Sequence, residues 1–144
     1  MPDTTFRPGG LNPIHAILLA FPMVCFSAAL VTDIAYLRTA EIQWTNFSSW
    51  LIAGGLVFTG MVLAWALVSL AMGFRSDHRL RAGVYAGLLA VLFVIELVNA
   101  FQHSRDGWSS VGTLGLLLSI LGTALAIAAG VVAHSRLFSP ETVR

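Results

Sequence analysis

Four polar side chains that can bind ligands or transfer protons fall within long apolar stretches of the sequence. Glu96, Asn99 and His103 follow one another at spacings of three and four residues, so they share one face of a helix. Asp33 lies at the corresponding depth of another apolar stretch. An ionisable group inside a membrane is costly unless it is paired or solvated. We therefore expect these residues to form a polar pocket that opens to the outer face of the membrane.

The residue types allow two interpretations of this polar pocket. It is either a site for proton-linked chemistry, a metal ion or a quinone head group, or a hydrogen-bonded plug between helices. In the second case Glu96 pairs with Arg38 or Arg105, or stays protonated.

A second group of candidates consists of two histidines at the other end of the apolar stretches. His15 begins the first stretch and His134 ends the last. The first and last helices of an up-down bundle are neighbours, so the two imidazoles can face each other and would suit a b-type haem. Histidines at helix ends also bond to lipid head groups or loop carbonyls. Haem b and a quinone are thus the candidate cofactors, and no metal is identified.

The elements that must position these residues are four apolar stretches, at roughly 14–36, 50–73, 83–101 and 111–133. A helix needs about 20 apolar residues to cross the hydrocarbon core, so each stretch is long enough to span once. Hydrophobic residues make up 57% of the chain and charged residues 10%, whereas soluble domains carry about 25% charged residues. We predict an all-α polytopic membrane protein, a four-transmembrane-helix up-down bundle over residues 13–135 with short tails at 1–12 and 136–144.

The distribution of arginine predicts the orientation of this bundle, because the chain contains no lysine. Four crossings place both tails and the middle connection on one side. Only Arg38 and Arg105 fall on the opposite side. Positively charged residues in short loops stay cytoplasmic, so both termini are expected in the cytoplasm and the protein in the inner (plasma) membrane. The arginines on the predicted cytoplasmic side are Arg7, Arg75, Arg79, Arg81, Arg136 and Arg144.

Small residues four positions apart predict where helices approach one another closely. These seams join helices of one chain or of two subunits, and the sequence leaves both open. Between the first two stretches, the segment Leu37–Ser49 is expected to be a short interfacial helix or an ordered loop. The residues predicted at the seams are Gly83, Gly87, Gly115, Ser119, Gly122 and Gly130.

The run Asn12-Pro13-Ile14-His15, followed by Phe21-Pro22 and Asp33, resembles the start of DUF2231, an uncharacterised prokaryotic family of small four-helix membrane proteins. The resemblance covers about residues 11–135 and implies the same fold and location. Members typically begin HPxHP and often carry a histidine early in the third helix. Here Asn12 and Tyr85 stand in those regions, so a metal or haem site built on these histidines would be lost. Relatives joined to Rieske-type iron–sulphur domains imply redox surroundings.

These observations lead to three functional hypotheses. The favoured one is a non-catalytic accessory or structural subunit, in contact with the lipid bilayer and with a homo-oligomer or a larger membrane complex, near an electron-transfer complex. The alternatives are a haem- or quinone-binding redox protein and a small proton-coupled transporter using Glu96. The sequence contains no HExxH, GxSxG or phosphate-binding glycine loop, so an enzyme is not expected. Without a basic cluster, nucleic acid is not an expected partner.

Overall fold

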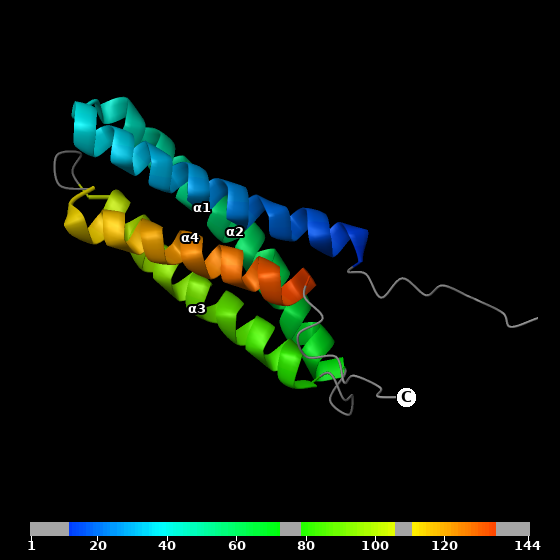
Figure 1. The fold of residues 1–144 in the computed structure, drawn as a ribbon. Helices are drawn as coiled ribbons and strands as arrows, with labels where there is room; N and C mark the ends of the chain where they lie inside the picture. Colours follow the sequence, from blue (N-terminus) through cyan, green and yellow to red (C-terminus); the bar gives the residue numbers. More distant parts are fainter. Residues whose placement is uncertain (1–11, 73–78, 106–110, 135–144) are drawn as a thin grey trace, which may run out of the picture.

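A computed structural model describes residues 12–72, 79–105 and 111–134. These residues form four long helices, α1 (Pro13–Thr39), α2 (Ile42–Met72), α3 (Arg79–His103) and α4 (Thr113–His134). Each helix packs against the next along the chain, and α4 returns to pack against α1. Figure 1 shows the resulting up-and-down bundle, in which α1 begins and α4 ends at the same end. The prediction of an all-α four-helix bundle is confirmed.

The buried side chains follow a heptad pattern in all four helices. On α1, for example, His15, Leu19, Pro22, Phe26 and Ala29 are buried at alternating spacings of four and three residues. This period keeps one stripe of each helix facing the bundle axis when helices cross at a shallow angle. The apolar part of the core lies toward the end of the bundle that carries the start of α1 and the end of α4.

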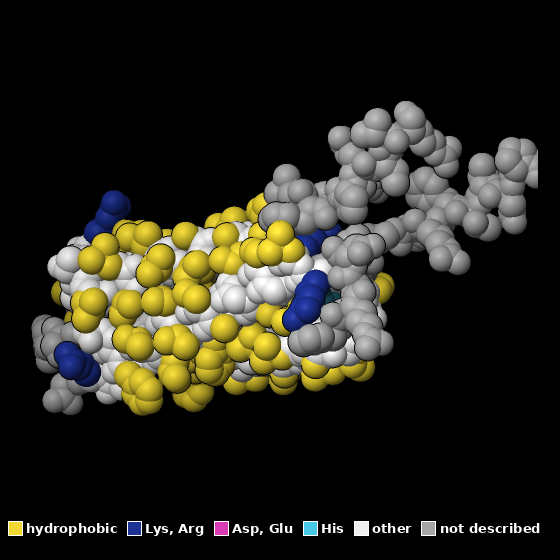
Figure 2. Space-filling view, turned by 90° about the horizontal axis from the view of Figure 1, so that it is seen from below, with side chains coloured by type: hydrophobic (Ala, Val, Ile, Leu, Met, Phe, Trp, Pro, Cys, Tyr) yellow, Lys and Arg dark blue, Asp and Glu magenta, His cyan; other side chains and the backbone are white. Residues whose placement is uncertain are grey.

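The outer surface of the bundle is apolar along its whole length. All four helices are long and apolar enough to cross a membrane. Figure 2 shows hydrophobic side chains along this face, with arginines at both ends of the bundle. A surface of this kind is stable in contact with lipid acyl chains. The protein is therefore an integral membrane protein, whereas the cytoplasmic location of its termini stays a prediction from the arginine distribution.

The sequence marks the beginning of α1 and the short connection between α1 and α2. Asn12 caps α1, because its Oδ1 accepts a hydrogen bond from the Ile14 amide at 3.0 Å. At the other end, Ala40 takes a left-handed conformation with φ 56°, and its N–H donates to the Tyr36 carbonyl. This left-handed residue ends α1 and lets the chain reverse direction within Ala40 and Glu41.

The boundaries of the second helix require a correction. We expected it to begin near Trp50, after an interfacial helix or loop at Leu37–Ser49, but α2 begins at Ile42. The physical reason is that Thr45 and Ser48 continue the buried heptad stripe of α2, and Ser48 bonds to Ala29 and Asp33 of α1. The polar residues of this segment therefore lie against other helices of the bundle. The remaining helix ends differ from the expected ones by only a few residues.

One arginine stabilises the end of α4. Arg81 on α3 donates from Nε to the Val132 carbonyl at 3.2 Å and from Nη2 to the Ala133 carbonyl at 2.8 Å. Carbonyls in the last turn of a helix have no partner within that helix. We expect Arg81→Gln to lower the free energy of unfolding in detergent by about 1 kcal/mol. Arg38→Gln, an exposed arginine at the other end, is the control and should cause no loss.

Candidate functional site: a buried polar network

The carboxylate of Asp33 connects all four helices at the end of the bundle that holds the α1–α2 connection. Its Oδ1 accepts from His103 Nε2 on α3 at 2.9 Å and from Ser48 Oγ on α2. Its Oδ2 accepts from Ser119 Oγ on α4 at 2.5 Å. Asp33 is 0% exposed and His103 5%. One side chain of α1 is thus bonded to each of the other three helices.

His103 is held by two acceptors. Its Nδ1 faces the Asn99 carbonyl, one turn earlier on α3, at 3.0 Å, while Nε2 faces Asp33. A carbonyl and a carboxylate both accept hydrogen bonds, so an imidazolium with a proton on each nitrogen satisfies both contacts. In that form Asp33 and His103 make a buried ion pair.

Asn99 links this pair to the second buried acid. Its Nδ2 lies 3.1 Å from Glu96 Oε2 and 3.0 Å from Ser119 Oγ. The other carboxylate oxygen of Glu96, Oε1, has no hydrogen-bond partner in the described part of the chain. It lies against Gly122 of α4, where a Cβ atom would collide with it. The glycine therefore makes the space that the Glu96 carboxylate occupies.

The structure brings together the four residues that the sequence singled out for the outer end. It differs from the expected arrangement in one respect, because the side chains are enclosed rather than open to the surface. The hydroxyls of Ser48 and Ser119 fill the space between the helices that we expected to be a pocket. The suggested pairing of Glu96 with Arg38 or Arg105 is wrong, since Glu96 is bonded to Asn99 instead.

Sequence reasoning did not find Ser48 as a member of the network. Its hydroxyl lies within hydrogen-bond distance of Asp33, Thr32 and the Ala29 carbonyl, so it joins α2 to α1 at several points. Ser48 precedes Ile52 and Gly55 in the buried heptad stripe of α2. That spacing was the available signal, but we expected the helix to begin after Ser48.

The two histidines proposed as haem ligands each bond to a different neighbour. His15 Nε2 lies 2.9 Å from the Tyr85 hydroxyl, and His134 Nδ1 lies 2.8 Å from the Gly130 carbonyl. Haem ligation through Nε2 of His15 would require its bond to Tyr85 to break. No group of three or more metal-binding side chains occurs among the residues that the structure describes. Cofactor binding by His15 and His134 stays a prediction.

The small residues of the predicted seams fall into two groups. Those on α4 face the interior: Gly115 and Ser119 are buried, Gly122 contacts Glu96, and Gly130 lies against Met23, whose Sδ would be 2.6 Å from an added Cβ. Those on α3 are different. A Cβ atom at Gly83 or Gly87 would meet no heavy atom within 4 Å, so packing within the chain does not require glycine there.

The apolar exterior and the four spanning helices define the class of protein as a small polytopic membrane protein. The chain belongs to the DUF2231 family, whose description is "Predicted membrane protein" and which matches residues 11–132. The resemblance seen in the sequence is thereby confirmed. No match was found among the curated proteins or the solved structures compared with the chain.

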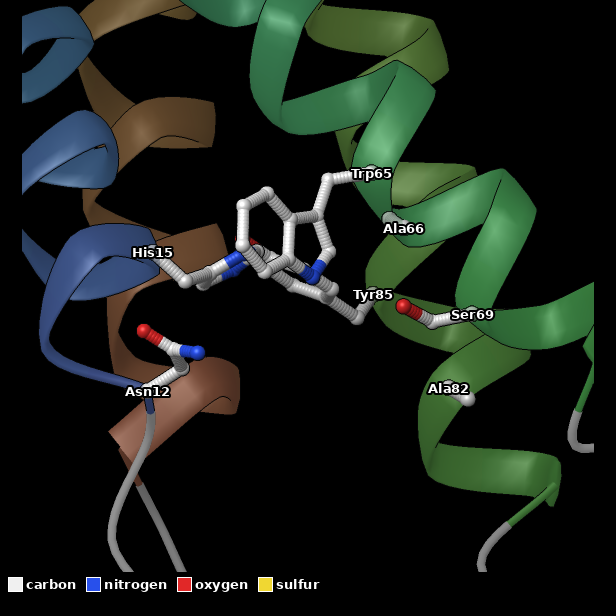
Figure 3. Close-up of a pocket in the computed structure, with 7 residues that line it drawn as sticks. All are labelled: Asn12, His15, Trp65, Ala66, Ser69, Ala82 and Tyr85. Atoms are coloured by element: carbon white, nitrogen blue, oxygen red, sulfur yellow. The ribbon is translucent and has the colours of Figure 1, made fainter.

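A pocket brings together residues from three helices at the other end of the bundle. Asn12, His15 and Tyr85 line this pocket at the end of the bundle opposite to Asp33, together with Trp65 of α2 (Figure 3). The buried side chains between this pocket and the Asp33 network are mostly apolar, including Leu19, Phe26, Val62, Leu89 and Leu92, and the buried Thr59 hydroxyl donates to the Gly55 carbonyl of its own helix.

Proposed function

We propose that the protein is a non-catalytic membrane subunit that works by packing against a helix of another membrane protein. The observation that carries this proposal is the use of Asp33, which is bonded to three other helices. The carboxylate and imidazole that could take part in chemistry are hydrogen-bonded between helices and hold the bundle together. In lipid, helices gain little from hydrophobic association, so such bonds and close packing specify the fold.

The face of α3 around Gly83 and Gly87 is the proposed contact surface. The two glycines lie four residues apart, and their own bundle leaves the space beside them free. A depression of about 560 Å³ beside Gly83 is lined by Arg79, Leu80, Gly83 and Val84. Glycines at this spacing let a second helix approach its neighbour closely. The redox surroundings that the family resemblance implies make an electron-transfer complex the first partner to examine.

Native purification tests this proposal. The tagged protein, extracted from its own membrane with a mild detergent, should migrate far above its 15.4 kDa monomer mass. Mass spectrometry of the purified band should identify a second polypeptide. Migration as a free monomer, or as an assembly of this chain alone, would contradict the proposal.

A pair of substitutions tests the contact surface. We expect Gly83→Leu combined with Gly87→Leu to abolish co-purification of the partner, because the added side chains keep a second helix at a distance. The melting temperature of the bundle should not change, since both sites have free space within the chain. Gly54→Leu on α2 is the matched control, as an added Cβ there also meets nothing. If the double variant retains its partner, the contact lies elsewhere.

A further inference from the structure

A pocket lies between α1, α2 and α3 at the end of the bundle opposite to Asp33. It has a volume of about 210 Å³ and is lined by Asn12, His15, Trp65, Ala66, Ser69, Ala82 and Tyr85. Figure 3 shows His15, Trp65 and Tyr85 converging from three helices, with the Ser69 hydroxyl turned toward the same space. None of these residues takes part in the Asp33 network.

One ring nitrogen of His15, a residue that lines this pocket, makes no hydrogen bond within the described part of the chain. Its side chain is buried, at 5% exposure, and Nε2 is bonded to the Tyr85 hydroxyl. The other ring nitrogen, Nδ1, has no hydrogen-bond partner among the residues that the structure describes. Buried polar atoms in native proteins are nearly always paired, and an exception calls for an explanation such as a missing ligand or water. Nδ1 therefore indicates that the pocket receives a group with a hydrogen-bonding atom.

The hydrogen bond between His15 and Tyr85 can run in either direction, so the pair can meet a ligand group that accepts a hydrogen bond or one that donates it. If the Tyr85 hydroxyl donates to Nε2, the imidazole carries its proton on Nδ1 and offers it to a carbonyl oxygen. If Nε2 donates to Tyr85, Nδ1 becomes an acceptor for a hydroxyl, and the phenol proton is free to donate. The same pair of residues thus accommodates the oxidised and the reduced form of a quinone ring.

The described side chains that line the pocket are aromatic, small or amide groups, which favours a flat ring. No arginine, aspartate or glutamate occurs among the described residues that line the pocket. The Trp65 indole stands edge-on to the His15 imidazole, with ring centroids 5.6 Å apart and an angle of 69°. Ala66 and Ala82 leave the remaining walls smooth. Aromatic and small apolar walls with a few polar atoms are typical of sites for uncharged ring compounds.

An apolar groove continues from the pocket along the outside of α2. It has a volume of about 400 Å³ and is lined by Met61, Ala64, Trp65, Val68, Ser69 and Met72. Trp65 and Ser69 line both spaces, so the two are adjacent. The groove faces the lipid, because Met61, Val68 and Met72 are each at least half exposed. An apolar tail of the ligand would lie here.

We propose that this pocket and groove bind a quinone-type lipid. A ring oxygen of the quinone contacts His15 and Tyr85, the ring lies beside Trp65, and the tail follows the groove on α2. This inference goes beyond the subunit role proposed above and does not depend on it, because the isolated chain contains all the residues involved.

Binding of decylubiquinone to the purified protein in phosphatidylcholine nanodiscs tests the inference. The background is a chain in which Trp44, Trp50 and Trp108 are replaced by Phe, so that emission reports on Trp65 alone. Quinone dissolved in the lipid quenches the Trp65 fluorescence in proportion to its concentration. Quinone bound in the pocket adds a component of quenching that saturates as the site fills. We expect His15→Phe to raise the Kd of this component about tenfold, the loss of one desolvated hydrogen bond. His134→Phe, at the same end but outside the pocket, should leave the Kd unchanged.

A second variant guards against a folding defect at position 15. Ala82→Phe fills the pocket without removing a polar atom, so it should abolish saturable quenching while the melting temperature stays that of the parent. The inference is overturned if the parent shows no saturable component, or if folded His15→Phe and Ala82→Phe proteins both bind as the parent does. Displacement of decylubiquinone by equimolar dioleoylglycerol would assign the pocket to an ordinary neutral lipid and would also overturn it.

Discussion

Replacement of Asp33 by alanine is expected to lower the free energy of unfolding by about 3–5 kcal/mol. Hydrogen bonds between membrane helices are worth about 0.6 kcal/mol each on average, and three of them would account for only about 2 kcal/mol. With His103 in its protonated form, the ion pair between the two side chains raises the expected loss. Without Asp33, the buried imidazole would have no acceptor at Nε2, and breaking such a pair costs more than its hydrogen bonds alone.

The measurement is unfolding of the purified protein by SDS in mixed micelles, followed by far-ultraviolet circular dichroism. Glu41→Gln is the matched control, because Glu41 is an exposed acid in the α1–α2 connection. The loss of unfolding free energy for Asp33→Asn should lie between those of Asp33→Ala and Glu41→Gln. The asparagine retains one acceptor oxygen but presents an amide donor to groups that themselves donate. A loss of less than about 0.5 kcal/mol for Asp33→Ala, the range of ordinary surface substitutions, would show that the network does not hold the bundle together.

The parts of the structure that could be predicted from the sequence follow from length and period. Apolar length alone identifies the four spanning helices, because the bilayer sets how long such a stretch must be. The spacing of Glu96, Asn99 and His103 places them on one face of α3, and the structure shows all three buried there. The depth of Asp33 along α1 brings it to the same level, as its contact with His103 shows.

The start of α2 could not be predicted in this way. Local hydropathy reports how well a segment suits lipid, and the segment 42–49 contains several polar residues. Thr45 and Ser48 face other helices rather than lipid, so their polarity does not end the helix. The same limit applies to His15, whose neighbours Trp65 and Tyr85 lie far away in the sequence. Which side chains meet across a bundle depends on how each helix is rotated about its axis.

Replacement of Gly122 by alanine is expected to lower the free energy of unfolding by about 1–3 kcal/mol, the usual cost of overpacking a filled interior. The added methyl group would collide with the Glu96 carboxylate. That carboxylate cannot simply move away, because it is 0% exposed and bonded to Asn99. Gly54→Ala is the control, since a Cβ at Gly54 meets nothing within 4 Å. It should change stability by less than about 0.5 kcal/mol.

A double-mutant cycle identifies the contact responsible. Glu96→Ala removes the carboxylate and opens the space into which the methyl group at position 122 would project. The combined variant should therefore be more stable than the sum of the two single losses predicts, with a coupling of about 1 kcal/mol or more. Additive losses would mean that position 122 requires glycine for the approach of α3 and α4 rather than for Glu96.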